Sequence, residues 1–153
     1  RRNMNVDLGG GVFLQILFPD RDPTGMDTNM ASVVAKLVYG QNEFLLTGDS
    51  PMSMENYLVS LEGHLQNAPV PEDVLQSDVL KVGHHGSKTS TGQAFISAVS
   101  PDYAIISVGK DNKYGHPNQE VLNLLNSMGI NILRTDEQGR IVFKSDGINL
   151  KIK

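Results

Sequence analysis

Three apolar segments of this chain, each about as long as a buried strand, end abruptly in polar side chains. Phe44–Thr47 leads to Asp49, Asp78–Gly83 leads to His84 and His85, and Tyr103–Val108 leads to a loop that holds Asn112, Tyr114 and His116. In α/β proteins such strands alternate with helices, and ligands bind where the carboxyl ends of the strands meet. The pattern therefore predicts a sheet with carboxylate and imidazole groups along one edge, which indicates a hydrolytic metal site.

The sequence also predicts further strands and the helices that connect them. Apolar runs predict additional strands at residues 12–18, 32–39, 130–134, 140–144 and 148–152. The strand over 32–39 is predicted to form an antiparallel hairpin with the strand over 43–47 that leads to Asp49. Helical spacing and start signals predict helices from Pro51, capped by Ser50, to about Leu65, from near Thr91 to Val99, and from Pro117 to Met128, with a loop over Asn67–Pro71. The order predicts a mixed α/β sheet layered with helices, and no linker divides residues 1–153 into domains.

Composition excludes several classes of function. The chain of 153 residues has no long apolar run, no charged-then-apolar leader and no cysteine. We therefore expect no membrane-spanning helix, no signal peptide, and neither a thiolate ligand nor a cysteine nucleophile. The net charge of −4 argues against a generally basic surface for nucleic acid.

The charge is nevertheless uneven along the chain. Residues 1–80 carry four basic and eleven acidic side chains, a sum of −7, and residues 81–153 carry nine basic and six acidic, a sum of +3. The lysines in or beside the candidate site loops are Lys81, Lys88, Lys110 and Lys113. They are either ordinary solubilising residues or a positive rim for an anionic substrate, and both interpretations stay open.

Asp49 and the histidine pair are the candidate metal ligands. Asp49 follows a strand and a glycine; it is either a turn or capping residue, or a carboxylate that points off the sheet edge and can bridge two cations. Imidazole binds zinc, manganese and iron, but successive side chains of a strand diverge. One of His84 and His85 is therefore expected to bind metal, and the other to contact substrate or support the first. Ser87 and Ser90 offer hydroxyls for phosphate oxygens.

The segment Tyr114–Pro117 opens the last predicted helix. His116 lies where the helix dipole favours anions, so it could bind a phosphate or protonate a leaving group. The alternative is that His116 only caps the helix.

The ordered series of motifs resembles the metallo-β-lactamase superfamily, and within it the carboxy-terminal hydrolase domain of ComEC-type DNA-internalisation competence proteins. The segments that carry the resemblance, over about residues 8 to 147, are Leu45–Asp49, Asp78–Ser90, Ile106–Gly109, Asp111–Asn112, Tyr114–Pro117, Arg134–Asp136 and Gly139. It implies an αβ/βα sandwich that holds one or two divalent metal ions, zinc or manganese. Asp49 would bridge the metals, and His85, or else His84, would bind the second. The residues that would face substrate are Ser87, Lys88, Ser90, Asn112, Tyr114 and His116.

This sequence departs from the superfamily pattern in two ways. The signature His-x-His-x-Asp-His is absent from these residues, which implies that the chain is the later part of a longer hydrolase domain. Asn29 stands near the place of the usual third-motif histidine, and asparagine is a poor zinc ligand. We therefore expect weak metal binding and little activity from the chain in isolation.

The resemblance implies a nuclease that acts on single- or double-stranded DNA during natural DNA uptake. Its location would be cytoplasmic, as a domain attached to a membrane channel in the inner membrane. Two alternatives stay open: a hydrolase of small phosphoesters on the same fold, and a degenerate, non-catalytic domain that binds nucleic acid or a partner protein. Oligomeric state is not predicted.

Overall fold

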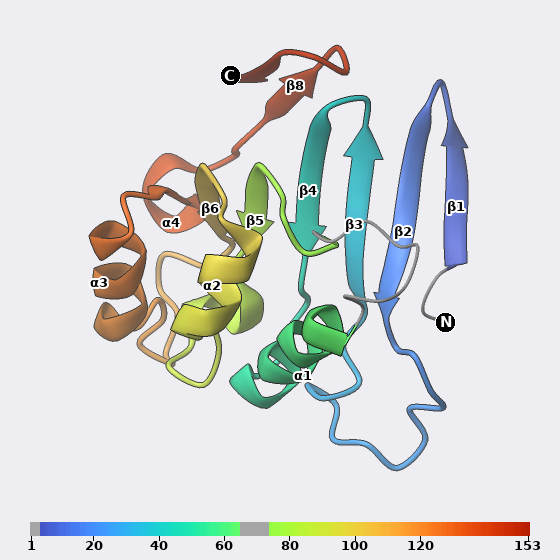
Figure 1. The fold of residues 1–153 in the computed structure, drawn as a ribbon. Coiled ribbons are helices and arrows are strands. Elements are labelled where there is room, and N and C mark those ends of the chain that lie inside the picture. The colour runs from blue at the N-terminus through green and yellow to red at the C-terminus, as the bar shows by residue number, and fades with distance from the viewer. Residues whose placement is uncertain (1–3, 65–73) are drawn as a thin grey trace.

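The structure is a computed structural model that describes residues 4–64 and 74–153 (Figure 1). The strands are β1 (Met4–Gly9), β2 (Val12–Phe18), β3 (Val34–Tyr39), β4 (Asn42–Leu46), β5 (Val79–Lys81), β6 (Tyr103–Ile106), β7 (Asn131–Arg134), β8 (Phe143–Ser145) and β9 (Leu150–Ile152). The helices are α1 (Met52–His64), α2 (Gln93–Val99), α3 (Gln119–Ser127) and α4 (Thr135–Gln138), with a short 3₁₀ segment, η1 (Gly83–Gly86).

The first seven strands form one mixed sheet in sequential order. Strands β1 to β4 pair antiparallel, whereas β4 to β7 pair parallel. Parallel neighbours need a crossover connection, and α1, α2 and α3 lie in the connections between β4, β5, β6 and β7. The four parallel strands consequently end at the same edge of the sheet, which is the edge that the sequence predicts to carry the site.

One face of the sheet is buried under the crossover helices. Leu45, Leu80 and Ala104 stand side by side in the register of β4, β5 and β6, and all three are buried. The helix residues that pack in the same core are Met54, Leu58, Phe95, Ile96, Val99, Val121 and Leu125. Each large side chain removed from water contributes roughly 1.5–3 kcal/mol, so this layer holds the strand ends in fixed relative positions.

The opposite face of the sheet is apolar but only partly covered. One row of it joins Val6, Leu14, Leu37 and Phe44 across β1 to β4. Phe143 of β8 packs edge-on against Phe44 and Tyr103, with ring centroids 5.8 and 5.6 Å apart, so the ribbon of β8 and β9 covers one part. The large apolar side chains of β1 and β4 that stay exposed are Met4, Val6, Leu8 and Leu46. Surfaces of this kind are commonly covered by another layer of structure.

The predicted mixed α/β architecture is confirmed, as is the hairpin of β3 and β4. The strand over residues 12–18 has the predicted bounds. The sequence analysis misses β1, which is exposed along its length and is held by its pairing with β2, and α4, which is a single polar turn. The predicted strand over 140–144 is shorter and later, at Phe143–Ser145. The predicted loop over Asn67–Pro71 lies outside the described residues.

The predicted starts of two helices are wrong. The Ser50 hydroxyl is buried and makes no hydrogen bond within the described part of the chain, so it does not cap α1. Helix α3 begins at Gln119 rather than at the predicted Pro117. Its cap is Asn118, whose side chain accepts the Glu120 N–H at 3.0 Å, so the alternative in which His116 caps this helix is also wrong.

Glu55 ties helix α1 to the segment that follows η1. Its side chain is buried in α1, with 1% of the residue exposed, and accepts the backbone N–H groups of Thr91 and Gly92 at 2.7 and 2.8 Å. Thr91 has a positive φ of 69°, a conformation that costs free energy and needs support from its surroundings. The buried carboxylate provides that support immediately before α2 begins.

We predict that Glu55→Gln flattens the dependence of stability on pH. Burial raises the pKa of the Glu55 carboxyl, and the N–H groups of Gly92 and Thr91 oppose that shift. A carboxyl with a raised pKa holds its proton more tightly in the folded state. Its contribution to the unfolding free energy therefore falls as pH rises from 4.5 to the raised value.

Chemical denaturation from about pH 4 to 8 checks this prediction. The variant should also lose about 1–3 kcal/mol at low pH, because its amide leaves one N–H unpaired. Glu120→Gln, at an exposed position of α3, is the control and should follow the native profile. A profile for Glu55→Gln that is as steep as the native one above pH 4.5 would contradict the prediction.

Candidate functional site

Three segments meet at the carboxyl edge of the parallel strands: the turn Thr47–Asp49, the segment η1 and the loop from Ser107 to Asn118. Backbone and side-chain hydrogen bonds join them. The Thr47 hydroxyl donates to the Lys81 carbonyl at 2.7 Å, and the His84 N–H donates to the Gly48 carbonyl at 3.2 Å. The Asn118 N–H donates to the Gly86 carbonyl at 2.8 Å. The candidate residues are therefore held on one framework although they come from distant parts of the chain.

The histidine pair lies in a left-handed turn rather than on a strand. His84, His85 and Gly86 have φ values of 47°, 56° and 79°, a region that residues with a Cβ seldom adopt. Gly86 is required for space as well, because a Cβ there would lie 2.7 Å from the Pro117 Cβ. Two successive non-glycine residues in this region store about 1–3 kcal/mol each, and such strain is concentrated at functional sites. The turn presents the two imidazole rings 6.4 Å apart.

His85 is oriented as a metal ligand would be. Its Nδ1 lies 2.6 Å from the Ser107 carbonyl oxygen, which can only accept, so in the neutral ring Nδ1 carries the proton and Nε2 keeps its lone pair. Nε2 lies 3.7 Å from Asp49 Oδ1, which is too long for a hydrogen bond. Two ligands about 2.0–2.1 Å from one zinc ion stand roughly 3.4 Å apart at a tetrahedral angle. Both side chains are half-exposed and converge on one point.

The donor set fits a divalent cation in kind but not in number. A carboxylate oxygen and a neutral imidazole nitrogen suit zinc and manganese, and a carbonyl bonded to the far ring nitrogen is the usual support for a ligating histidine. Among residues 4–64 and 74–153, however, no three histidine, aspartate or glutamate side chains are grouped closely enough to hold a metal ion. The described residues therefore offer two candidate donors, Asp49 and His85, which are fewer than a metal site normally has.

His84 and His116 lie beside this pair. Their ring centroids are 5.8 Å apart, and the Nδ1 atoms of both rings are buried without a hydrogen-bond partner in the described part of the chain. Unpaired buried nitrogens are uncommon in native proteins, and they occur at binding and catalytic sites. Burial lowers the pKa of His116, and the neighbouring His84 and His85 lower it further. His116 is therefore neutral at pH 7.

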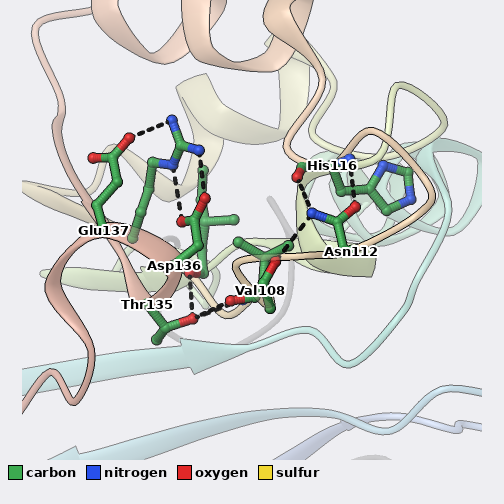
Figure 2. A network of polar contacts seen from close by, with 9 residues as sticks. Val108, Asn112, His116, Thr135, Asp136 and Glu137 are labelled. Carbon is green, nitrogen blue, oxygen red and sulfur yellow. Dashed lines mark hydrogen bonds and ion pairs between the residues drawn. The ribbon is translucent and has the colours of Figure 1, made fainter.

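Asn112 closes the loop that carries His116 (Figure 2). Its side-chain nitrogen donates to the His116 carbonyl at 2.7 Å, and its side-chain oxygen accepts the His116 N–H at 3.0 Å. Tyr114 lies inside the closed loop and its ring is nearly parallel to that of His116, at 21° and a centroid distance of 6.0 Å. Asn112 thus has a structural role in the loop, whereas Tyr114 is open to solvent.

A second network in Figure 2 fixes the strand end that supports His85. The Thr135 hydroxyl accepts the Val108 N–H and donates to the Val108 carbonyl, both at 2.8 Å. The Arg134 guanidinium holds the Asp136 carboxylate at 2.6 and 3.1 Å and the Glu137 carboxylate at 2.7 Å. Ser107, whose carbonyl orients His85, precedes Val108 directly. Sequence analysis assigns no role to Thr135, and only its place in the Arg134–Asp136 motif singles it out.

Lys81 lies near Asp49. Its ammonium group donates to the Gly48 carbonyl at 3.1 Å and to the Val82 carbonyl at 3.3 Å. Burial lowers the pKa of Lys81, and the Asp49 carboxylate opposes that shift. Lys88, Lys110 and Lys113 are exposed on the surrounding loops.

The structure uses the two predicted serines inside their own loop. Ser90 is buried, and its hydroxyl lies 2.9 and 3.0 Å from the carbonyls of Gly83 and Ser87. Ser87 is also buried, and its hydroxyl pairs with that of Thr89 at 3.0 Å. Hydroxyls engaged in this way support the loop, so the geometry favours a structural role for both over contact with phosphate.

Comparison with known proteins finds clear relatives. The chain is 40% identical over 129 residues to ComE operon protein 3 of Bacillus subtilis, and this match covers 84% of the chain and 15% of that protein. It is 39% identical over 133 residues to competence protein ComA of Neisseria gonorrhoeae, which is 87% of this chain and 18% of the relative. Recombination protein 2 of Haemophilus influenzae is 36% identical over 131 residues, 86% of this chain and 15% of the relative. The chain thus spans less than a fifth of the length of these relatives.

The fold also has a solved counterpart. A crystal structure from Parabacteroides distasonis, named "Putative metal-dependent hydrolase", matches with a TM-score of 0.51 at 15% identity. The match covers 88% of this chain and 56% of that one, and at this identity it shows a shared fold alone. No protein-family model matches the chain. No helix in the described residues is long and apolar enough to span a membrane.

We predict that His116 titrates below the usual histidine pKa of 6.5 in the folded chain. Its resonance can be assigned by comparison with His116→Asn in two-dimensional NMR spectra recorded without metal from about pH 5 to 8. Replacing the neighbour in His84→Asn should move the His116 midpoint upward, because one positive charge is then removed at low pH. A His116 midpoint above 6.5, or no response to His84→Asn, would contradict this explanation.

Proposed function

Since this chain is homologous to a segment of ComEC-family competence proteins, we propose that it forms part of a metal-dependent phosphodiesterase that cleaves DNA during natural DNA uptake. The observation that carries the proposal is the convergence of Asp49 and His85, with His85 Nδ1 engaged by a carbonyl and Nε2 facing the carboxylate. The names of the relatives support the role in competence, and the hydrolase fold of the solved neighbour supports the class of reaction.

In the proposed site, Asp49 and His85 would hold a divalent cation, with His84 as the alternative ligand. One or two zinc or manganese ions would lower the pKa of a bound water and neutralise phosphate charge. The Ser107 carbonyl keeps His85 in the tautomer that leaves Nε2 unprotonated. His116 is neutral at pH 7, so its N–H can donate a hydrogen bond to a phosphate or leaving oxygen, whereas full protonation becomes available only at lower pH.

The proposed substrate is DNA, either single- or double-stranded. Phosphodiester backbones are bound mainly through lysine and arginine, and Lys88, Lys110 and Lys113 are exposed around the site. These lysines offset the acidic character of the first half of the chain, whose sum of charges is −7. Tyr114 and His116 would lie on the substrate side, while Asn112, Ser87 and Ser90 would shape the loops.

We also propose that the chain is the later part of a larger hydrolase domain. The partly uncovered apolar face of β1 to β4 supports this, as does the match to only 56% of the solved neighbour. Further metal ligands would then come from that other part. By analogy with the much longer competence proteins, the domain would be the cytoplasmic part of an inner-membrane protein, attached to a membrane channel domain.

One observation favours a second candidate, a non-catalytic domain that binds DNA. The described residues contain no group of three metal-ligating side chains, and a hydrolytic metal site normally has at least that many. Cleavage assays on a panel of substrates, with the native protein and a variant of one proposed ligand, distinguish the two candidates. The same panel shows whether DNA or a small phosphodiester is the substrate.

We predict that Asp49→Asn lowers manganese-dependent cleavage by at least about 100-fold in a longer polypeptide that includes the His-x-His-x-Asp-His segment of such domains. The amide cannot supply the negative charge that the cation requires. End-labelled single- and double-stranded DNA and a small phosphodiester serve as substrates, with turnover measured with and without chelator. The chain of residues 1–153 alone should show little activity.

The matched control is Asp102→Asn. Asp102 is exposed and precedes β6, at the opposite end of the strand from the site, so its substitution should leave turnover unchanged. Equal activity in Asp49→Asn and the native protein would exclude the proposed mechanism. Binding of DNA without any metal-dependent cleavage, in folded protein loaded with manganese, would establish the binding domain instead.

A further inference from the structure

The loop beside the candidate site displays an aromatic ring that the proposed chemistry does not use. Tyr114 is 83% exposed, the highest exposure among the exposed large hydrophobic side chains of the described residues. Removing an aromatic ring from water is favourable, so a ring displayed in this way loses free energy unless a ligand covers it. Two exposed lysines, Lys110 and Lys113, precede it in the same loop.

The loop that carries the ring is closed by hydrogen bonds. Asn112 bonds both backbone polar groups of His116 and so closes the loop around Tyr114. One side of the Tyr114 ring faces the nearly parallel His116 ring, 6.0 Å away between centroids, and most of the ring surface stays open. A ring pre-positioned by its loop pays little ordering cost when a flat ligand stacks on it.

The position of the ring relates it to the reacting phosphate. The His116 ring neighbours the rings of both Tyr114 and His84, with centroid distances of 6.0 and 5.8 Å, so one ring links Tyr114 to the histidine turn. Successive bases of a stacked strand are roughly 3.4 Å apart. A base stacked on Tyr114 would therefore belong to a nucleotide one or a few positions from a phosphate bound beside His84.

We infer that Tyr114 is a stacking platform for one nucleobase of the substrate, and that it makes the site select unpaired nucleotides next to the cleaved bond. This inference rests on the proposed nuclease function. It deepens that function, because it specifies a single-stranded or frayed DNA end as the substrate and gives Tyr114 a role in specificity. Aromatic platforms flanked by basic residues bind single strands with little sequence preference, because every base offers a π-face.

The test compares two oligonucleotides of equal charge. One is fluorescein-labelled oligodeoxythymidylate, and the other has the same length but abasic sugars throughout its central segment. Anisotropy titrations use the chain of 153 residues with chelator present, so that binding is measured without cleavage. The native chain should bind the thymidylate more tightly. Tyr114→Ala should weaken that binding about 5- to 150-fold and leave binding of the abasic oligonucleotide unchanged.

Three control variants separate stacking from charge and from general surface effects. Tyr114→Phe keeps the ring and should bind both oligonucleotides as the native chain does. Lys113→Ala should weaken binding of both to the same extent, because it removes only charge. Phe13→Ala removes another exposed aromatic ring, on β2, and should change neither.

Intrinsic fluorescence supplies an independent measurement. The chain has no tryptophan and four tyrosines, so its emission comes from tyrosine. A base stacked on Tyr114 should quench the part of the emission that comes from Tyr114. In Tyr114→Phe that part is absent, so the same DNA should quench the remaining emission less. Duplex DNA of the same length should quench less, since its bases are already stacked.

The possible outcomes distinguish this inference from the proposed function. Equal binding of the two oligonucleotides, no binding of either, or an equal loss for both in Tyr114→Ala would overturn the stacking platform. Base-dependent binding through Tyr114, combined with absence of metal-dependent cleavage in the longer polypeptide, would support the platform and overturn the nuclease. Cleavage that is lost in Asp49→Asn but is unchanged by Tyr114→Ala and by abasic substitution would support the nuclease and overturn the platform.

Discussion

The left-handed turn at His84, His85 and Gly86 is the constraint on which the candidate site depends. Two residues with side chains adopt positive φ values there, and that conformation persists only because its surroundings hold it. The Gly48 carbonyl binds the turn on one side, and Pro117 and Asn118 contact Gly86 on the other. Through the turn, His85 faces Asp49 while its Nδ1 reaches Ser107. Without it, the adjacent histidines would point to opposite sides of the sheet.

Several polar side chains near the turn form hydrogen bonds with backbone groups of the surrounding loops. Glu55 accepts two backbone N–H groups at the start of α2, Thr135 bonds both polar groups of Val108, and Lys81 donates to two carbonyls near Asp49. Polar side chains inside a protein are costly unless their hydrogen bonds are made. Their hydrogen bonds hold the loops at one edge of the sheet in defined positions. The helices stabilise the sheet itself by apolar contact.

Several observations agree with the proposal that the described residues belong to a larger hydrolase domain. Asp49 and His85 supply two donors, one apolar face of the sheet is partly open, and the relatives are far longer than this chain. These observations share one physical cause under the proposed function, since the polypeptide that covers the sheet would also bring the remaining ligands. The Tyr114 loop needs no contribution from that other polypeptide, because its ring, its lysines and its closing hydrogen bonds all come from this chain.

The sequence by itself determined the fold class, the hairpin, the parallel strands and the edge on which the candidate residues lie, because apolar periodicity and chain order dictate these features. It singled out Asp49 and the histidine pair as candidate metal ligands. Only the tertiary structure decided that His85 faces Asp49, that Ser90 turns inward, and that α3 begins after Asn118 rather than at Pro117. Side-chain direction in a turn depends on φ values set by distant contacts, such as Gly86 against Pro117, and no local pattern records them. Thr135 and Glu55 escaped notice for the same reason, since their partners lie 27 or more residues away in the chain.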